Sequence, residues 1–93
     1  MAQCTIFWDE NFSGNAYVIN NSIPDFRNMS GEFPGQNWND ETSSIKVASG
    51  TWRFFADINY QGASKDLGPG EYRSTTSVGI VDNTISSVQL ISG

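Results

Sequence analysis

Two short clusters of Asn, Asp, Thr and Ser offer the groups with which this sequence could do chemistry. The clusters cover residues 39–44 and 82–87, and they read Asn-Asp-Glu-Thr-Ser-Ser and Asp-Asn-Thr-Ile-Ser-Ser. Their side chains provide carboxylate, amide and hydroxyl oxygens and no softer donor. A hard cation such as Ca²⁺ takes about six to eight such oxygens, together with backbone carbonyls and water, at about 2.3 to 2.6 Å. The clusters therefore predict sites for a hard divalent cation.

These clusters belong to an internal repeat. Residues 7–14 and 55–62 share the order aromatic, Asp, Asn, aromatic and Gly, and the two clusters form a second matching pair. The first pair lies 48 positions apart and the second pair 43, so the first copy contains five extra residues. We expect these extra residues in the Gly- and Asn-rich loop around residues 28–37.

A simpler explanation of the clusters is that Asn, Asp and Ser close turns and cap strand ends by hydrogen bonding to their own backbone. For a single cluster this explanation would be preferred. Two clusters at the same point of each repeat, each behind an aromatic hairpin sequence, favour cation binding instead.

The rest of the chain has the pattern of β-strands. Short apolar alternations are separated by Gly, Pro, Asn and Asp, and no window shows the sustained apolar period of a helix. Residues 44–48, 51–54 and 87–90 each place their apolar side chains on one face of a strand. The chain is therefore predicted to be all-β.

The repeats should combine into one two-sheet domain. Each copy is too short to bury its own apolar face but long enough for four strands. We expect a single domain over residues 1–93, with repeat one at about 3–48 and repeat two at about 49–93, packed face to face as antiparallel sheets with Greek-key connections. In each hairpin the two aromatic rings should stack on the loop, and the glycine should adopt a left-handed conformation.

The hairpin and cluster patterns together resemble the βγ-crystallin superfamily. Its repeats begin with aromatic-x4-aromatic-x-Gly, and its calcium-binding members carry N/D-N/D-x-x-S/T-S in each repeat. The resemblance covers nearly the whole chain, and residues 49–55 and 66–72 look most like small microbial single-domain members. It implies a Greek-key β-sandwich with two Ca²⁺ ions per chain.

The resemblance also implies a ligand set, in which two antiparallel motifs share both ions near the top of the sandwich. One ion would take Asp40 with its neighbouring backbone and the hydroxyl of Ser86. The other would take Asn83 with its neighbouring backbone and the hydroxyl of Ser43. We expect both serines at the rim of the sandwich, outside the apolar core. The candidate metal ligands are Trp8, Asn39, Asp40, Glu41, Ser43, Ala56, Asp82, Asn83, Thr84 and Ser86.

Trp8 and Ala56 enter this set because the family uses the backbone carbonyl of the residue after the first aromatic of each hairpin. A carbonyl ligand leaves the side chain free to vary, although Trp8 is bulkier than the polar residue often found there. The sequence leaves open which of Asn39, Asp40 and Glu41 presents its side chain to the ion.

Composition argues against several other functions. The chain has no histidine and one cysteine, so it lacks the usual general base and cannot form an internal disulfide. Its net charge is −5 and its five Lys and Arg residues are scattered, which disfavours a phosphate-tracking surface. No apolar run approaches the about 20 residues of a membrane helix. We expect a monomer that binds calcium ions, does not bind nucleic acid and does not insert into a membrane. The sequence identifies no macromolecular partner and does not distinguish an extracellular from a cytoplasmic location.

Weaker candidate sites have simpler explanations. Hairpin turns account for the carboxylates that a glycosidase could use as an acid and base pair. Trp8, Trp38 and Trp52 could stack on sugars, but tryptophans at alternating strand positions more often pack in a core. Cys4, without a histidine to activate it, should be a partly buried small apolar residue.

The sequence thus predicts a calcium-binding module and not an enzyme. The two ions would bridge the repeats and stabilise the fold, with a structural or Ca²⁺-buffering role. The alternative is a protein- or carbohydrate-binding module, lectin-like or inhibitor-like, on the same scaffold.

Overall fold

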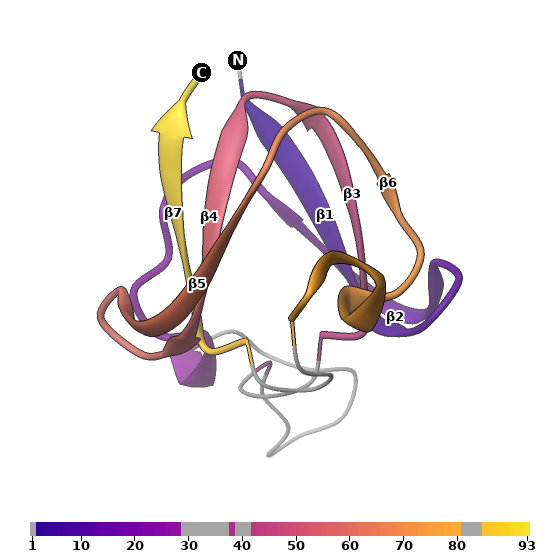
Figure 1. The fold of residues 1–93 in the computed structure, drawn as a ribbon, viewed down its shortest axis with the longest axis horizontal. Coiled ribbons are helices and arrows are strands. Elements are labelled where there is room, and N and C mark those ends of the chain that lie inside the picture. Colours follow the sequence, from indigo (N-terminus) through magenta and orange to yellow (C-terminus); the bar gives the residue numbers. More distant parts are fainter. Residues whose placement is uncertain (1, 29–37, 39–41, 81–84) are drawn as a thin grey trace.

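The computed structural model describes residues 2–28, 38, 42–80 and 85–93, which form two antiparallel sheets packed face to face (Figure 1). One sheet has the strand order β2-β1-β3-β6 and the other has the order β5-β4-β7. The strands are β1 (Gln3–Asp9), β2 (Ser13–Ile19), β3 (Ser44–Ser49), β4 (Thr51–Asp57), β5 (Gln61–Leu67), β6 (Gly70–Tyr72) and β7 (Ser87–Ser92). The predicted all-β Greek-key sandwich is confirmed.

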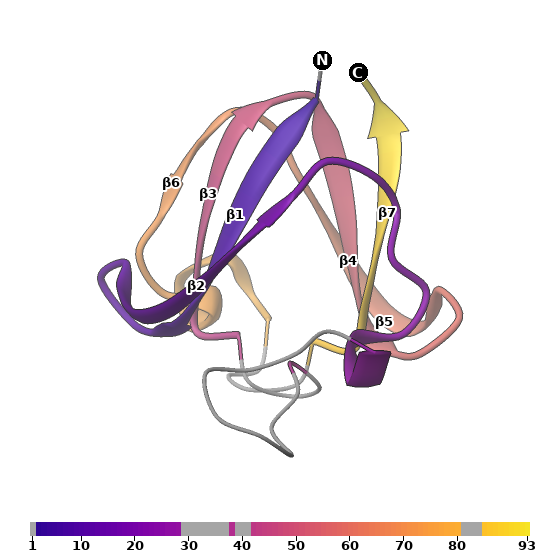
Figure 2. The ribbon, with the colours of Figure 1, turned by 180° about the vertical axis from the view of Figure 1, so that it is seen from behind.

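Two short 3-10 helices, η1 (Phe26–Asn28) and η2 (Thr75–Val78), join the strands. In the described part of the chain, neither is long or apolar enough to cross a membrane. The termini lie close together at one end of the sandwich, and β3 and β7 both begin at the opposite end (Figures 1 and 2).

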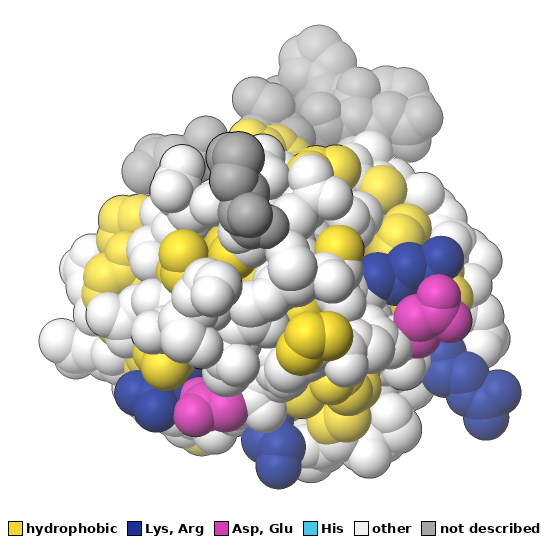
Figure 3. Space-filling view, turned by 90° about the horizontal axis from the view of Figure 1, so that it is seen from above, with side chains coloured by type: hydrophobic (Ala, Val, Ile, Leu, Met, Phe, Trp, Pro, Cys, Tyr) yellow, Lys and Arg dark blue, Asp and Glu magenta, His cyan; other side chains and the backbone are white. Residues whose placement is uncertain are grey.

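The core lies between the sheets and follows from the alternation of the strands. Each central strand turns every second side chain inward, so that polar neighbours such as Lys46 and Arg53 stay partly exposed. The tightly buried apolar side chains include Cys4, Ile6, Ile45, Val47, Trp52, Phe54 and Val88. Seen from the end that carries the termini, the basic side chains are spread around the margin (Figure 3).

The repeats exchange their third strands, which differs from the expectation that each repeat forms one sheet. β6 of the second repeat pairs with β3 of the first, with Ile45 opposite Tyr72. In the same way Ile23 of the first repeat forms a bridge with Val88 of β7. The exchange covers an edge of β3 and an edge of β7 that would otherwise present unpaired backbone groups. Each sheet is therefore built from both repeats.

The two aromatic hairpins have the same backbone. Phe7 packs edge-on against Phe12 with ring centroids 5.6 Å apart, and the ring of Phe55 lies tilted against Tyr60 at 5.8 Å. The glycines that follow are left-handed, with φ of 78° at Gly14 and 80° at Gly62. Four non-glycine residues are also left-handed, with φ of 59° to 60°, a feature that was not predicted: Asn11, Phe12, Asn59 and Tyr60.

Candidate metal centre

Four of the ten predicted ligands lie in the described part of the chain: Trp8, Ser43, Ala56 and Ser86. The other six lie outside the described residues: Asn39, Asp40, Glu41, Asp82, Asn83 and Thr84. The loop that was expected to hold the five extra residues also falls largely outside them. The geometry of the centre therefore rests on two hairpin residues and two serines.

Trp8 and Ala56 lie where the register of each hairpin shifts. In β1 the pairing with β2 shifts between Phe7 and Asp9, and in β4 the pairing with β5 shifts between Phe55 and Asp57. At each shift one residue of β1 or β4 lies opposite two residues of β2 or β5, so the extra residue of the bulge belongs to β2 or β5, and Trp8 and Ala56 have no single partner in the register. The backbone of Trp8 and of Ala56 is thus set apart from the regular pairing at the same point of each hairpin.

Ser43 and Ser86 are held beside these bulges by matching hydrogen bonds. The backbone N–H of Ser43 donates to the carbonyl of Phe7, and that of Ser86 donates to the carbonyl of Phe55, both at 2.9 Å. Each motif serine therefore sits next to the strand residue that precedes the bulge. Both serines lie where β3 and β7 begin, but only 5% and 4% of their surface is exposed, which is more burial than a rim position suggests.

Each motif is also attached to the opposite repeat. The carbonyl of Ser43 accepts a hydrogen bond from the backbone of Thr75, at the start of η2, and the carbonyl of Ser86 accepts one from Phe26, at the start of η1, both at 2.9 Å. The hairpin loops cross over too, because the N–H of Asn59 donates to the carbonyl of Pro24 at 2.7 Å. The two motifs and the two repeats thus interlock around this end of the sandwich.

The last serine of each motif has a role that the sequence analysis missed. The hydroxyl of Ser44 donates to the carbonyl of Asp9 at 2.6 Å and accepts from the N–H of Phe12 at 3.0 Å. The hydroxyl of Ser87 makes the equivalent bonds to Asp57 at 2.6 Å and from Tyr60 at 3.2 Å. The sequence did contain a signal for this role, because both six-residue motifs end in Ser-Ser and thus have serine at the sixth position.

Among the described residues, two buried polar atoms near the first motif have no hydrogen-bond partner, namely Nε1 of Trp38 and Oγ1 of Thr42. Buried polar groups without partners are rare and often mark a bound water or ion. Ile85 stands at the position equivalent to Thr42, so a hydroxyl is not required there. Within the described ranges no three Asp, Glu or Cys side chains gather as a metal-binding group.

The tryptophans do not offer a sugar-stacking surface in the described structure. Trp38 and Trp52 have no exposed surface, and the ring of Trp8 packs on Trp38 with centroids 5.3 Å apart. Cys4 is buried completely, which is more than expected, and burial raises the pKa of its thiol to about 12. The chain therefore has neither an exposed aromatic platform built from these rings nor a thiolate available at neutral pH.

Comparison with known proteins places this geometry in a family. The Beta/Gamma crystallin family model matches residues 3–91. A "Beta/gamma-crystallin" of Ciona intestinalis is 37% identical over 89 residues, which cover 96% of this chain and 98% of that protein.

Solved structures agree with this match. A βγ-crystallin from an archaeon is 46% identical, with a TM-score of 0.84 and coverage of 97% of this chain and 98% of its own. A transition-metal-ion-binding βγ-crystallin from Methanosaeta thermophila is 30% identical, with a TM-score of 0.74 and coverage of 94% and 98%. With its interlocked aromatic hairpins and exchanged strands, the chain belongs to the βγ-crystallin family, whose members are structural proteins and not enzymes.

Proposed function

We propose that this βγ-crystallin domain binds two Ca²⁺ ions, which stabilise the fold and give the domain a structural or Ca²⁺-buffering role. The observation that carries the proposal is the matched placement of the residue opposite each β-bulge and a motif serine at the same point of each repeat. Trp8 with Ser43, and Ala56 with Ser86, occupy equivalent positions. Because the two repeats hold these residues in equivalent positions, they support two equivalent metal sites.

The available donors favour a hard cation over a transition metal. The Methanosaeta thermophila relative binds transition-metal ions, and imidazole and thiolate are the protein ligands that such metals prefer. This chain has no histidine, and its one cysteine is buried and protonated. Carboxylate, amide, hydroxyl and carbonyl oxygens are left, and these suit Ca²⁺.

The proposed sites are crossed between the repeats. Asp40 and the carbonyl of Trp8 would share one ion with the hydroxyl of Ser86, while Asn83 and the carbonyl of Ala56 would share the other with the hydroxyl of Ser43. The backbone bonds from Thr75 and Phe26, which hold each serine against the other repeat, support this arrangement. The remaining motif residues, Asn39, Glu41, Asp82 and Thr84, complete the candidate set. In this proposal the two repeats that share the ions are residues 3–48 and 49–93.

Calorimetric titration of metal-stripped protein tests the proposal. We expect two Ca²⁺ per chain, with dissociation constants between about 10⁻⁶ and 10⁻⁴ M because few formal charges surround each ion. Mg²⁺ should compete poorly, since it requires a smaller and more regular octahedron. Saturation without any bound ion would refute the proposal, and saturation at one ion would refute the second site.

A serine variant tests the crossing. Ser86→Ala removes one hydroxyl ligand with little change of volume, so it should weaken one of the two sites, and Asp40→Asn should weaken the same site. Ser92→Ala, an exposed position at the other end of β7, is the matched control and should leave both sites intact. If Ser86→Ala and Asp40→Asn weaken different sites, each motif binds its ion alone.

A further inference from the structure

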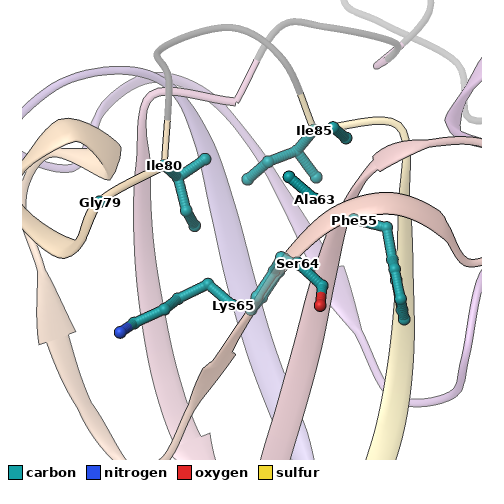
Figure 4. Close-up of a pocket in the computed structure, with 9 residues that line it drawn as sticks. Phe55, Ala63, Ser64, Lys65, Gly79, Ile80 and Ile85 are labelled. Carbon is teal, nitrogen blue, oxygen red and sulfur yellow. The ribbon is translucent and has the colours of Figure 1, made fainter.

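A cavity of about 210 Å³ opens beside β4 and β5 in the second half of the sandwich (Figure 4). Phe54 and Ile85 form its apolar wall and are buried, while the side chain of Phe55, whose residue also borders the cavity, points to the other face of β4 (Figure 4). Gly79 and Ile80, which follow η2, close the side opposite to β5. The hollow is therefore a defined space between several elements.

The first half of the molecule has the same strand pairing around the equivalent position, but its side chains differ. Phe54 pairs with Lys65 in the second hairpin, and Ile6 pairs with Tyr17 at the same register in the first. Ala56, which lies opposite the bulge of β5, also lines the cavity, and its counterpart is Trp8. Tyr17 and Trp8 thus occupy the positions that Lys65 and Ala56 occupy around the cavity.

In the first half, the indole ring of Trp38 packs against both Trp8 and Tyr17. The ring of Trp38 packs on Trp8 with centroids 5.3 Å apart and on Tyr17 with centroids 6.0 Å apart, and it is completely buried. The backbone N–H of Trp38 donates to the carbonyl of Phe26 at 3.2 Å.

The same backbone bond holds Ile80 in the second half. Its N–H donates to the carbonyl of Thr75 at 3.0 Å, and Thr75 corresponds to Phe26 because each of them donates to the motif serine of the other repeat. Ile80 therefore makes the backbone bond that Trp38 makes, although the match of residues 39–44 with 82–87 aligns Trp38 with Val81, which lies outside the described residues. The smaller side chains of Ile80 and Ala56 leave open a space that Trp38 and Trp8 fill in the other half.

We propose that this cavity binds a small planar aromatic acid, with its ring between β5 and Ile80 and its carboxylate on Lys65. The ring would take the place that the Trp38 indole takes in the first half. The volume is suitable, because a cavity of about 150 Å³ in another protein holds benzene and typical drug-sized ligands need about 300 Å³ or more. A ligand of one or two rings fits between these limits.

Lys65 gives the cavity its preference for an acid. Its side chain lines the cavity and extends from β5 toward the side of Gly79 and Ile80 (Figure 4). Among the described residues it takes no part in an ion pair, whereas Lys46, Arg53 and Arg27 each do. The hydroxyl of Ser64, the neighbouring residue, points to the opposite side of β5 (Figure 4). Tyr17, the counterpart of Lys65, has a phenol in place of the ammonium group.

Titration with indole-3-acetate, followed by ¹H–¹⁵N NMR, tests the proposal. We expect saturable shifts confined to the amides around the cavity, such as those of Ala63, Ser64 and Gly79, with a dissociation constant on the order of 0.1 mM for a ligand of this size. The titration is repeated in Ca²⁺ and in EDTA, so that its result does not depend on metal binding. Acetate alone should cause no saturable shift.

Two variants with matched controls distinguish the contribution of the ring-binding space from the contribution of the Lys65 charge to ligand binding. Ile80→Trp should fill the cavity and abolish binding, while Ile91→Trp, at a 41% exposed position on β7, should bind as the parent does. Lys65→Met should weaken binding of the acid about three- to fivefold and leave neutral indole unchanged, whereas Lys46→Met should alter neither. The proposal is overturned if no saturable shift appears up to 10 mM ligand, a concentration on the order of 100 times the expected constant. Shifts in the first half of the chain, or undiminished binding by Ile80→Trp, would overturn it as well.

Discussion

Ser44 and Ser87 each use one buried hydroxyl to tie a hairpin loop to the strand beside it. Each hydroxyl donates to the carbonyl at the end of the hairpin's first strand and accepts from the N–H of the second aromatic residue. That aromatic residue has a left-handed backbone, an arrangement that costs energy for a bulky side chain. The serine hydroxyls offset this cost.

Replacing Ser87 by Ala should lower the free energy of unfolding by about 1 to 3 kcal/mol, because the carbonyl of Asp57 and the N–H of Tyr60 lose a buried partner. Ser44→Ala should cost a similar amount in the first hairpin. Urea unfolding gives both values. Ser13→Ala, at an exposed position, is the control and should change stability by less than about 0.5 kcal/mol. Equal stability of all three variants would show that the hydroxyls do not hold the loops.

The thiol of Cys4 should be inert in the folded protein. Burial raises its pKa from 9.0 to about 12, so the folded state favours the neutral thiol. A pKa raised by folding leaves stability intact below about pH 9 and lowers it as the pH rises toward 12, because the unfolded chain ionises first. Labelling with a thiol reagent at pH 8 should proceed only as fast as the protein opens. Cys4→Ala should lack the loss of stability above pH 9 that is due to this group.

At the scale of single residues, the sequence predicted which side chains are buried better than it predicted their hydrogen-bond partners. Cys4, Trp38 and Trp52 were expected in or near the core, and all are buried. The role of Ser44 was not predicted, because its partners, Asp9 and Phe12, lie more than 30 positions away. A hydroxyl bond of this range leaves no local pattern in a sequence.

The two hairpins show how an element depends on glycine where the chain comes close to itself. Gly14 and Gly62 are both left-handed, and a Cβ on either would lie 2.6 Å from a carboxylate oxygen of Asp9 or Asp57. A non-glycine residue would thus meet both backbone strain and a clash. The spacing of the aromatic residues and the glycine predicted this hairpin, whereas the left-handed Phe12 and Tyr60 could not be predicted, since aromatic residues rarely adopt that conformation.

Gly62→Ala should destabilise the domain by about 1 to 3 kcal/mol through this strain. Gly68→Ala is the matched control, because Gly68 lies in a connecting segment where a Cβ would meet no atom within 4 Å and its φ is not in the left-handed region. The thermal unfolding midpoint of Gly62→Ala should therefore lie clearly below that of Gly68→Ala. If both melted together, the close approach to Asp57 would not constrain position 62.

The third strand of each repeat escaped prediction for a physical reason. β6 has three residues and its counterpart is a single bridge at Ile23, so neither is long enough to show an alternating pattern. Greek-key connections were expected, but the sheet to which these short segments belong is decided by pairing partners far away in the sequence. Sequence alone could not assign them.

The molecule as a whole is a closed pair of interlocked halves, and the proposed ions would link those halves. A ligand that binds only the folded state adds about 2.7 kcal/mol per site at about 100 times its dissociation constant. Two linked sites would therefore contribute a large share of the about 5 to 15 kcal/mol that is typical of a domain.

Thermal unfolding in millimolar Ca²⁺ should occur at least several degrees above the transition in EDTA, because a domain of this size gains about 4 to 8 °C for each kcal/mol. Circular dichroism or calorimetry measures the shift. Mg²⁺ at the same concentration is the control and should raise the transition much less. Superimposed transitions in Ca²⁺ and EDTA would show that the metal does not stabilise the fold.

The exchange of third strands also sets the order in which the chain can fold during synthesis. β3 is complete at residue 49, but its partner β6 begins only at residue 70, and the bridge from Ile23 waits for Val88. Such distant pairings slow folding, since a long loop must close before they form. A ribosome-bound chain that has emerged only to residue 60 thus carries an incomplete sheet with an open edge, which is a typical starting point for aggregation. The interlocking that stabilises the finished domain leaves its first half dependent on the second until β6 and β7 have been synthesised.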